Sequence, residues 1–302
     1  MTPDREVKGS AAPREGLVVE AFGRHFGVAL AQGERVEAIQ RGRKLTPTCG
    51  DRVLLTVNAQ GAVIESIAPR RSLFYRASEF REKLIAANVT QVVMVVAGDP
   101  PFSTELLDRW LVVAEANDCR VLIVHNKIDL PGAQAAQQAL AAYAVLGYPM
   151  LRLCAKQDVS ALRPQLVHQH SVLIGQSGMG KSTLLNALLP GTAARTAEIS
   201  SALNAGRHTT THSTLYALDA ESWLIDSPGM QEFGLHHLSL GAIEAGFREF
   251  AALAGQCRFR DCAHQQEPGC ALRQAVAEGR ASGARMGSLL RCLGERRRAT
   301  AY

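Results

Sequence analysis

The chain has 302 residues, a mass of 32.5 kDa and a formal net charge of +5. Its 47% apolar and 20% charged residues are typical of a globular protein, which excludes a largely disordered or fibrous chain. The charge is unevenly distributed: residues 1–90 and 236–302 are basic, whereas residues 91–235 carry more Asp and Glu than Lys and Arg. Basic ends favour contact with a polyanion such as nucleic acid.

The length predicts two or three domains, at roughly 100 to 200 residues each. The longest apolar run, Val92 to Gly98, is far shorter than the about 20 residues of a membrane-spanning helix. Residues 1–15 mix charged and small side chains and lack the apolar core of a signal peptide, so we expect a disordered tail there. We expect a cytoplasmic protein that binds no membrane, and a monomer.

Short alternating segments separated by glycine and polar turns fill residues 16–70. Period-2 alternation of this kind predicts about five short strands in a small antiparallel barrel or sandwich. An OB-like barrel is one candidate, and the pattern does not distinguish it from other small barrels. Residues 71–88 are basic and include Phe74, Tyr75 and Phe80, which predicts a linker whose aromatic side chains either stack on RNA or pack between domains.

From residue 89 to 235 apolar strand-like runs alternate with helical patterns. The runs lie at residues 91–97, 120–124, 149–154, 171–174 and 222–225. Strands that are apolar on both faces, with helices between them, predict a mainly parallel, doubly wound α/β sheet. Ligands of such sheets bind beyond the carboxyl ends of the strands, and the unusual polar residues of this chain follow those ends.

A complete phosphate-loop motif, GQSGMGKS, follows the run at 171–174 and precedes a helical segment. Its glycines let backbone N–H groups surround phosphate, its lysine neutralises the outer phosphates, and its serine can bind Mg²⁺. The predicted nucleotide-binding residues of this motif are Gly175, Gln176, Ser177, Gly178, Met179, Gly180, Lys181, Ser182 and Thr183.

A base-recognition motif follows the run at 120–124, where the chain reads Asn126, Lys127, Ile128 and Asp129. The Asp129 carboxylate can accept hydrogen bonds from both N1–H and the exocyclic amine of guanine, whereas adenine offers no such pair of donors. The pattern therefore predicts GTP, with discrimination of roughly 10⁴-fold against a base that leaves the acceptor unpaired. The segment with Ala155 and Lys156, at the end of another strand-like run, can supply a backbone N–H to the guanine oxygen and a lysine stem over the base.

Two further segments point to Mg²⁺ and the γ-phosphate. Asp226 follows the last strand-like run and can hold Mg²⁺ through water, and the N–H of Gly229 is expected to face the γ-phosphate. A polar loop at 206–212 supplies hydroxyl groups, of which Thr210 is the predicted Mg²⁺-linked threonine, with Thr209 and Thr211 as rivals. The base motif precedes the phosphate loop, the reverse of the usual order in GTPases, so the domain is predicted to be circularly permuted.

Three of the seven cysteines cluster with one histidine near the carboxyl end. Cys257, Cys262, His264 and Cys270 have the spacing of a closed tetrahedral Zn²⁺ site, which predicts one structural zinc ion. Residues 236–302 are otherwise helical in pattern, and a small domain of this kind often needs such a metal. Buried reduced cysteines are the alternative interpretation.

Together these motifs resemble the ribosome small subunit-dependent GTPase A family, which consists of circularly permuted GTPases with an OB-like barrel and a zinc domain. The resemblance covers nearly the whole chain, including NKID, GQSGMGKSTLLN, GRHTTTHSTLY and CRFRDCAHQQEPGCAL. It implies GTP hydrolysis to GDP and phosphate, stimulated by the 30S subunit late in its assembly, and contact of both flanking domains with 16S rRNA.

The predicted catalytic residues are Lys181, Thr210 and His208. Many GTPases orient the attacking water with a glutamine after DxxG, but this chain has Met230 there, so turnover without the ribosome should be slow. His208 is the predicted replacement. Two other functions stay open: an rRNA-binding module in which GTP is only a conformational ligand, and an ATP-dependent small-molecule kinase, which Asp129 opposes.

Overall fold

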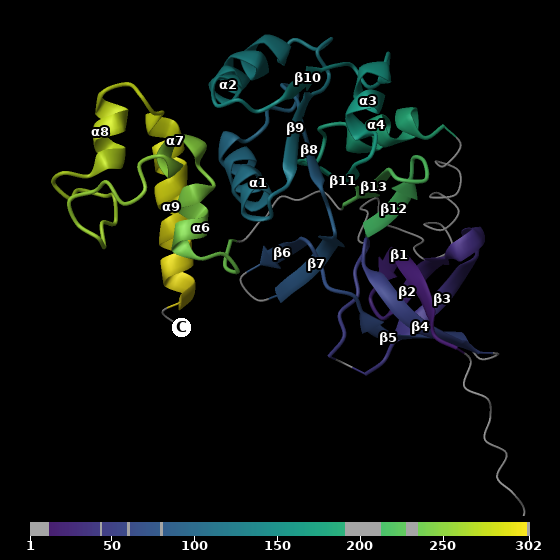
Figure 1. The fold of residues 1–302 in the computed structure, drawn as a ribbon. Coiled ribbons are helices and arrows are strands. Elements are labelled where there is room, and N and C mark those ends of the chain that lie inside the picture. Colours follow the sequence, from purple (N-terminus) through teal and green to yellow (C-terminus); the bar gives the residue numbers. More distant parts are fainter. Residues whose placement is uncertain are drawn as a thin grey trace, which may run out of the picture.

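The computed structural model describes residues 12–42, 44–58, 61–78, 81–190, 213–227 and 235–300. The predicted residues His208, Thr210 and Gly229 lie outside them, as do the rival threonines and Met230. Figure 1 shows a barrel, a central sheet with helices on both faces, and a group of helices at the carboxyl end. No described helix combines the length and apolar character needed to cross a bilayer.

The amino-terminal part is a closed five-stranded barrel. Its strands are β1 (Arg14–Phe22), β2 (His25–Leu30), β3 (Arg35–Gln40), β4 (Arg52–Asn58) and β5 (Gly61–Ile67), with the short 3-10 helix η1 (Ala31–Gly33) after β2. They pair in the order β1-β2-β3-β5-β4, and a β1–β4 pairing closes the ring. Alternate side chains such as Val28, Leu55 and Ile64 fill the interior, which confirms the predicted barrel. The prediction that all its strands pair antiparallel is wrong for β3 and β5, which pair in parallel.

The predicted linker contains a β-hairpin of β6 (Leu73–Ser78) and β7 (Arg81–Ala87). Phe74 is only 2% exposed, and the ring of Tyr75 lies 4.8 Å from that of His237. The Leu73 N–H donates to Asn117 Oδ1 at 3.0 Å, which ties the hairpin to the end of the first helix. These two aromatic side chains therefore pack within the protein.

The central sheet has five parallel strands in the order β10-β9-β8-β11-β13. They are β8 (Gln91–Val96), β9 (Arg120–His125), β10 (Met150–Arg152), β11 (His170–Ile174) and β13 (Trp223–Asp226). Every residue of β8 is buried, as expected for a strand covered on both faces. The doubly wound sheet predicted for this part of the chain is confirmed.

Helices cover both faces of this sheet. One face packs against α1 (Thr104–Ala116) and α2 (Ala133–Val145), and the other against η2 (Ser160–Leu162), α3 (Arg163–Leu166) and α4 (Lys181–Leu188). The α1 helix begins after Ser103, whose hydroxyl accepts the N–H of Leu106 at 3.2 Å. This arrangement leaves the carboxyl ends of the strands for ligand binding.

An antiparallel strand joins the barrel to the central sheet. The strand β12 (Ser213–Ala217) pairs with β13 on one side and with β1 on the other, through Glu20↔Thr214 and Ala21↔Ser213. The Cys49 thiol also donates to the Ser213 carbonyl at 3.0 Å. Barrel and central strands thus form one continuous 11-stranded sheet. The domain boundaries after residues 70, 88 and 235 stay a prediction.

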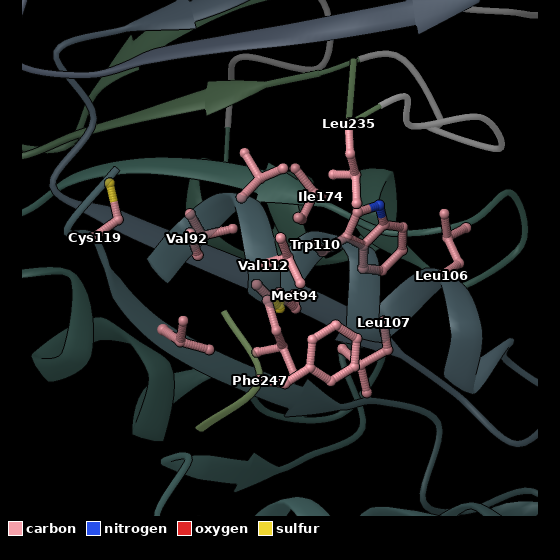
Figure 2. Close-up of a cluster of buried hydrophobic side chains, with 14 of the residues drawn as sticks. Val92, Met94, Leu106, Leu107, Trp110, Val112, Cys119, Ile174, Leu235 and Phe247 are labelled. Carbon is pink, nitrogen blue, oxygen red and sulfur yellow. The ribbon is translucent and has the colours of Figure 1, made fainter. Parts of the chain in front are cut away.

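The carboxyl-terminal helices share a hydrophobic core with the central domain. They are α6 (Leu240–Ala245), α7 (Arg248–Ala251), α8 (Ala271–Ala277) and α9 (Gly283–Thr300). In Figure 2, Phe247 lies beside Met94 of the sheet and Leu107 of α1. A Cβ at Gly246 would lie 2.8 Å from Val112 Cα, so only glycine permits this close approach. The last region is therefore docked through apolar packing.

A buried ion network crosses the same interface. Arg285 of α9 donates to the carboxylates of Asp108 on α1 and Glu249 on α7, and all three side chains are at most 6% exposed. The Tyr143 hydroxyl also donates to Asp108 at 2.8 Å. Burial raises the pKa of Asp108, and the Arg285 charge opposes this rise. The Arg285 guanidinium thus neutralises the charge of two carboxylates that are buried away from water.

His125 ends β9, directly before the base motif, and is an unsatisfied buried group. It is 1% exposed, and neither ring nitrogen has a hydrogen-bond partner among the described residues. Burial lowers its pKa, and Arg152, its register partner on β10, lowers it further. A neutral imidazole is thus favoured in the folded state, and two polar atoms lose water without compensation.

We expect His125→Leu to raise the free energy of unfolding by about 1 to 3 kcal/mol, because leucine has no polar atom to desolvate. Because the folded pKa is lowered, the unfolded state binds the extra proton, so wild-type stability falls as the pH drops through about 6.5. The gain from the substitution should accordingly be larger at pH 5.5 than at pH 8 in urea unfolding. Exposed His25→Leu is the control, and an equal gain at both pH values would contradict the prediction.

Candidate nucleotide-binding site and metal centre

The carboxyl ends of the parallel strands bring the predicted motifs to one edge of the sheet. The phosphate loop follows β11, the base motif follows β9, and Asp226 is the last residue of β13. Parallel pairing places these ends side by side, and Leu173 of β11 is in register with Asp226. Residues about 50 positions apart in the chain are therefore neighbours in the fold.

The side-chain amide of Asn126 connects three loops. Its Nδ2 donates to the Met179 carbonyl in the phosphate loop at 2.9 Å, and its Oδ1 accepts the Ala155 N–H at 2.9 Å. Asn126 is 1% exposed, so both bonds are protected from water. Gly180 fits beneath it because a Cβ there would lie 2.4 Å from Nδ2, and its φ of +91° also favours glycine.

A fourth loop, after β8, also contacts the phosphate loop. The Ser103 N–H donates to Gln176 Oε1 at 2.6 Å, and Lys127 Nζ donates to the Asp99 carbonyl at 2.8 Å. A Cβ at Gly178 would lie 3.1 Å from Pro100 Cγ. Sequence reasoning did not include this loop in the site. The sequence did contain a signal for this loop, because it follows the carboxyl end of a buried strand of the same sheet.

The base side of the site is built around Asp129. Its exposed carboxylate has a lowered pKa, chiefly because the Cys154 side chain hydrogen-bonds to it, and nearby Lys156 and Lys127 contribute. It is therefore an ionised acceptor at neutral pH, the form that a guanine edge requires. The Ala155 N–H donates to Asn126 Oδ1, which ties the loop after β10 to the base motif. The assignments of Asn126, Lys127, Ile128, Asp129, Ala155 and Lys156 to GTP stay a prediction.

The phosphate side holds two half-buried ionisable groups, Lys181 and Asp226. Lys181 Nζ donates to the carbonyls of Gly175 at 2.5 Å and Gln176 at 3.0 Å, and burial lowers its pKa. Burial raises the pKa of Asp226 to about 6, while the Lys181 charge opposes this rise. Ser182 is exposed at the start of α4. A hydroxyl and a carboxylate are ligands that suit Mg²⁺, and a phosphate would give Lys181 a charged partner.

The second cluster lies between α7 and α8. The ligand atoms of Cys257, Cys262, His264 and Cys270 all lie within 4.8 Å of one another. His264 Nδ1 lies 3.6 Å from Cys257 Sγ and 3.4 Å from Cys270 Sγ. A tetrahedral zinc ion with bonds of about 2.3 Å to sulfur and 2.0 to 2.1 Å to nitrogen separates these atoms by about 3.5 Å. The four residues therefore fit a closed metal site.

Comparison with known proteins identifies a GTPase family. A family model described as RsgA GTPase matches residues 67–236. The small ribosomal subunit biogenesis GTPase RsgA of Nitrosomonas europaea is 52% identical over 281 residues, 91% of this chain and 89% of that protein. The RsgA protein of Nitrosospira multiformis is 51% identical, over 90% of this chain and 88% of that protein.

Two solved structures share the fold. The crystal structure of YjeQ from Thermotoga maritima has a TM-score of 0.72 and 30% identity, and covers 94% of this chain and 99% of its own. That of YloQ, described as a circularly permuted GTPase, has a TM-score of 0.68 and 26% identity, and covers 97% and 98%. The permuted order of the loops around Asn126 has its counterpart there. This chain belongs to the RsgA GTPase family.

Proposed function

We propose that this protein hydrolyses GTP to GDP and phosphate on the small (30S) ribosomal subunit, late in the subunit's assembly. The observation that carries the proposal is the Asn126 amide, which holds the base loop and the phosphate loop at one edge of the sheet. A single GTP molecule spans such a pair of loops. Membership of a GTPase family and relatives named for small ribosomal subunit biogenesis support both halves of the proposal.

Each group of the nucleotide has proposed partners. Asp129 binds the guanine edge, and the backbone N–H groups of the phosphate loop, residues 175–183, surround the phosphates. Lys181 moves from its carbonyl partners to the β- and γ-phosphates, and Gly229 adds an N–H at the γ-phosphate. Ser182, Thr210 and Asp226 would hold Mg²⁺ beside the phosphates. The ion neutralises phosphate charge when it is bound.

Hydrolysis needs a group that orients the attacking water. Met230 occupies the position where many GTPases carry glutamine, and a thioether is at most a weak hydrogen-bond acceptor. We assign this role to His208, in the loop that also carries Thr210, and expect it to act once the ribosomal subunit orders that loop. Turnover by the isolated protein is then slow.

Contact with 16S rRNA is proposed for both flanking regions. In the metal-site loop Phe259 is 42% exposed, and the Arg258 guanidinium lies 5.5 Å from its ring centre. Arg260, the next residue in the chain, is also exposed. An exposed aromatic ring with a guanidinium group against it suits an unpaired base and its phosphates. We further propose that one structural Zn²⁺ holds this loop, and that the protein acts as a cytoplasmic monomer.

GTP turnover with and without purified small ribosomal subunits tests the proposal. We expect slow turnover by the protein alone and an increase of about 10²-fold or more with small subunits, as catalytic partners give other GTPases about 10³- to 10⁵-fold. Large subunits at the same concentration are the control for nonspecific stimulation by RNA. Binding to the small subunit should also weaken steeply with salt. The logarithm of the binding constant should fall against the logarithm of the salt concentration with a slope of roughly −0.7 to −0.9 per neutralised phosphate.

Equal turnover with small and large subunits, or none above background, would contradict the proposal. A His208→Ala protein that binds GTP normally but keeps full stimulated turnover would remove only the role of that histidine. If a variant that binds GTP without hydrolysing it still leaves the subunit at the wild-type rate, the protein is instead an rRNA-binding module in which GTP is a conformational ligand.

A further inference from the structure

We infer that Glu244 is the outer carboxylate of the metal centre and that it orients His264 for metal binding. Glu244 lies on α6, outside the ligand cluster and 13 residues before its first cysteine. The inference rests on the zinc site proposed above. It makes Glu244 a positioning residue, which acts on the metal only through the imidazole ring.

The orientation of the His264 ring carries the inference. Nδ1 faces the Cys257 and Cys270 thiols, whereas Nε2 points the opposite way and lies 3.3 Å from Glu244 Oε1. The ring is buried, and the Glu244 side chain is 30% exposed. A carboxylate at this position accepts the Nε2–H, which leaves the Nδ1 lone pair for the metal and makes it more basic.

The backbone of His264 is held separately from its ring. Its φ of +61° is unusual for a residue other than glycine. The Glu267 carboxylate accepts three N–H groups around this position, from Ala263 at 2.8 Å, Gln265 at 2.8 Å and Gln266 at 3.0 Å. Glu267 therefore orders the turn within the loop. Glu244 alone among the described carboxylates hydrogen-bonds to the ring.

The position of Glu244 is itself fixed by packing. The Ser239 hydroxyl accepts the N–H of Ala242 at 3.1 Å and caps α6. Ile243 of this helix is fully buried in the core shared with α1 and α9, and Arg296 of α9 donates to the Leu238 carbonyl at 2.6 Å. A rigid helix thus presents the carboxylate to His264. The metal centre spans α6 and the loop at 257–270, so metal loading should also order the contact between them.

The test is Zn²⁺ affinity of the full chain, measured by competition with a chelator of known affinity. We expect Glu244→Ala to weaken Zn²⁺ binding by about 10- to 100-fold, and Glu244→Gln, whose amide oxygen still accepts the Nε2–H, to weaken it less. Glu278→Gln is the matched control, because Glu278 lies in the same region but pairs with exposed Arg280. The Zn²⁺ affinity of the Glu278→Gln variant should equal that of the wild type.

Nitrogen-15 NMR of the histidine rings separates positioning from a loss of structure. The Zn²⁺-loaded wild type should show metal bound at Nδ1 of His264 and a proton on Nε2, with the Nε2–H signal weakened or shifted in Glu244→Ala. Unchanged Zn²⁺ affinity in Glu244→Ala, or metal bound at Nε2, would overturn the role of Glu244. A wild type that binds no Zn²⁺ would overturn the metal centre itself, while GTP turnover on the small subunit tests the proposed function independently.

Discussion

Replacing Asp129 by asparagine should lower the affinity for GTP by roughly 10²- to 10⁴-fold and raise that for xanthosine triphosphate. The carboxylate accepts N1–H and the exocyclic amine of guanine, and an amide cannot accept both. Xanthine carries a carbonyl at the amine's position, so the asparagine N–H can donate to it. Equilibrium binding of fluorescent analogues of GTP and xanthosine triphosphate measures both changes in affinity.

The control for this prediction is Asp158→Asn in the neighbouring loop. Asp158 accepts the N–H and the hydroxyl of Ser160, both at 2.8 Å, and belongs to no predicted base contact. Its substitution should leave the preference for GTP unchanged. If Asp129→Asn weakens GTP and xanthosine triphosphate equally, Asp129 orders the loop and does not read the base. Equal affinity of the wild type for ATP and GTP would favour the kinase alternative.

Removing the buried Arg285 side chain should lower the stability of the fold strongly. We expect Arg285→Ala to lower the free energy of unfolding by about 3 to 5 kcal/mol, because Asp108 and Glu249 are left buried without a counter-charge. The substitution should also detach α9 from α1, where the network crosses the interface. Urea unfolding followed by tryptophan fluorescence reports this change, because Trp110 lies in the shared core.

Two variants show whether charge compensation is the cause. Arg280→Ala removes an exposed ion pair with Glu278 and should cost far less stability than Arg285→Ala, because water screens the pair. The triple variant Asp108→Asn, Glu249→Gln, Arg285→Met has no buried charge in the network and should recover most of the stability lost by Arg285→Ala. A triple variant as unstable as Arg285→Ala would show that arginine packing against Phe247 and Tyr143, rather than charge, stabilises the interface.

The junction between barrel and central sheet shows what a local pattern cannot predict. Alternation in residues 16–70 predicted a barrel, and the apolar runs after residue 89 predicted a parallel sheet. Neither pattern indicates that β12 pairs with β1, because hydrogen bonding between these strands depends on how two distant segments are brought together. The hairpin in the predicted linker was missed, because the aromatic side chains of Phe74 and Tyr75 fit either packing between domains or an RNA contact and indicate no strand pairing.

The sequence by itself predicted the chemistry of this protein. The glycines and lysine of residues 175–182, the carboxylate of Asp129 and the spacing of the four predicted metal ligands are local features, so each can be identified without the fold. Only the tertiary structure decided which groups support them: Asn126 joins three loops, Arg285 neutralises two buried carboxylates, and Glu244 faces His264. These contacts join residues that lie far apart in the chain, and their partners are chosen by packing, which a local sequence pattern does not encode.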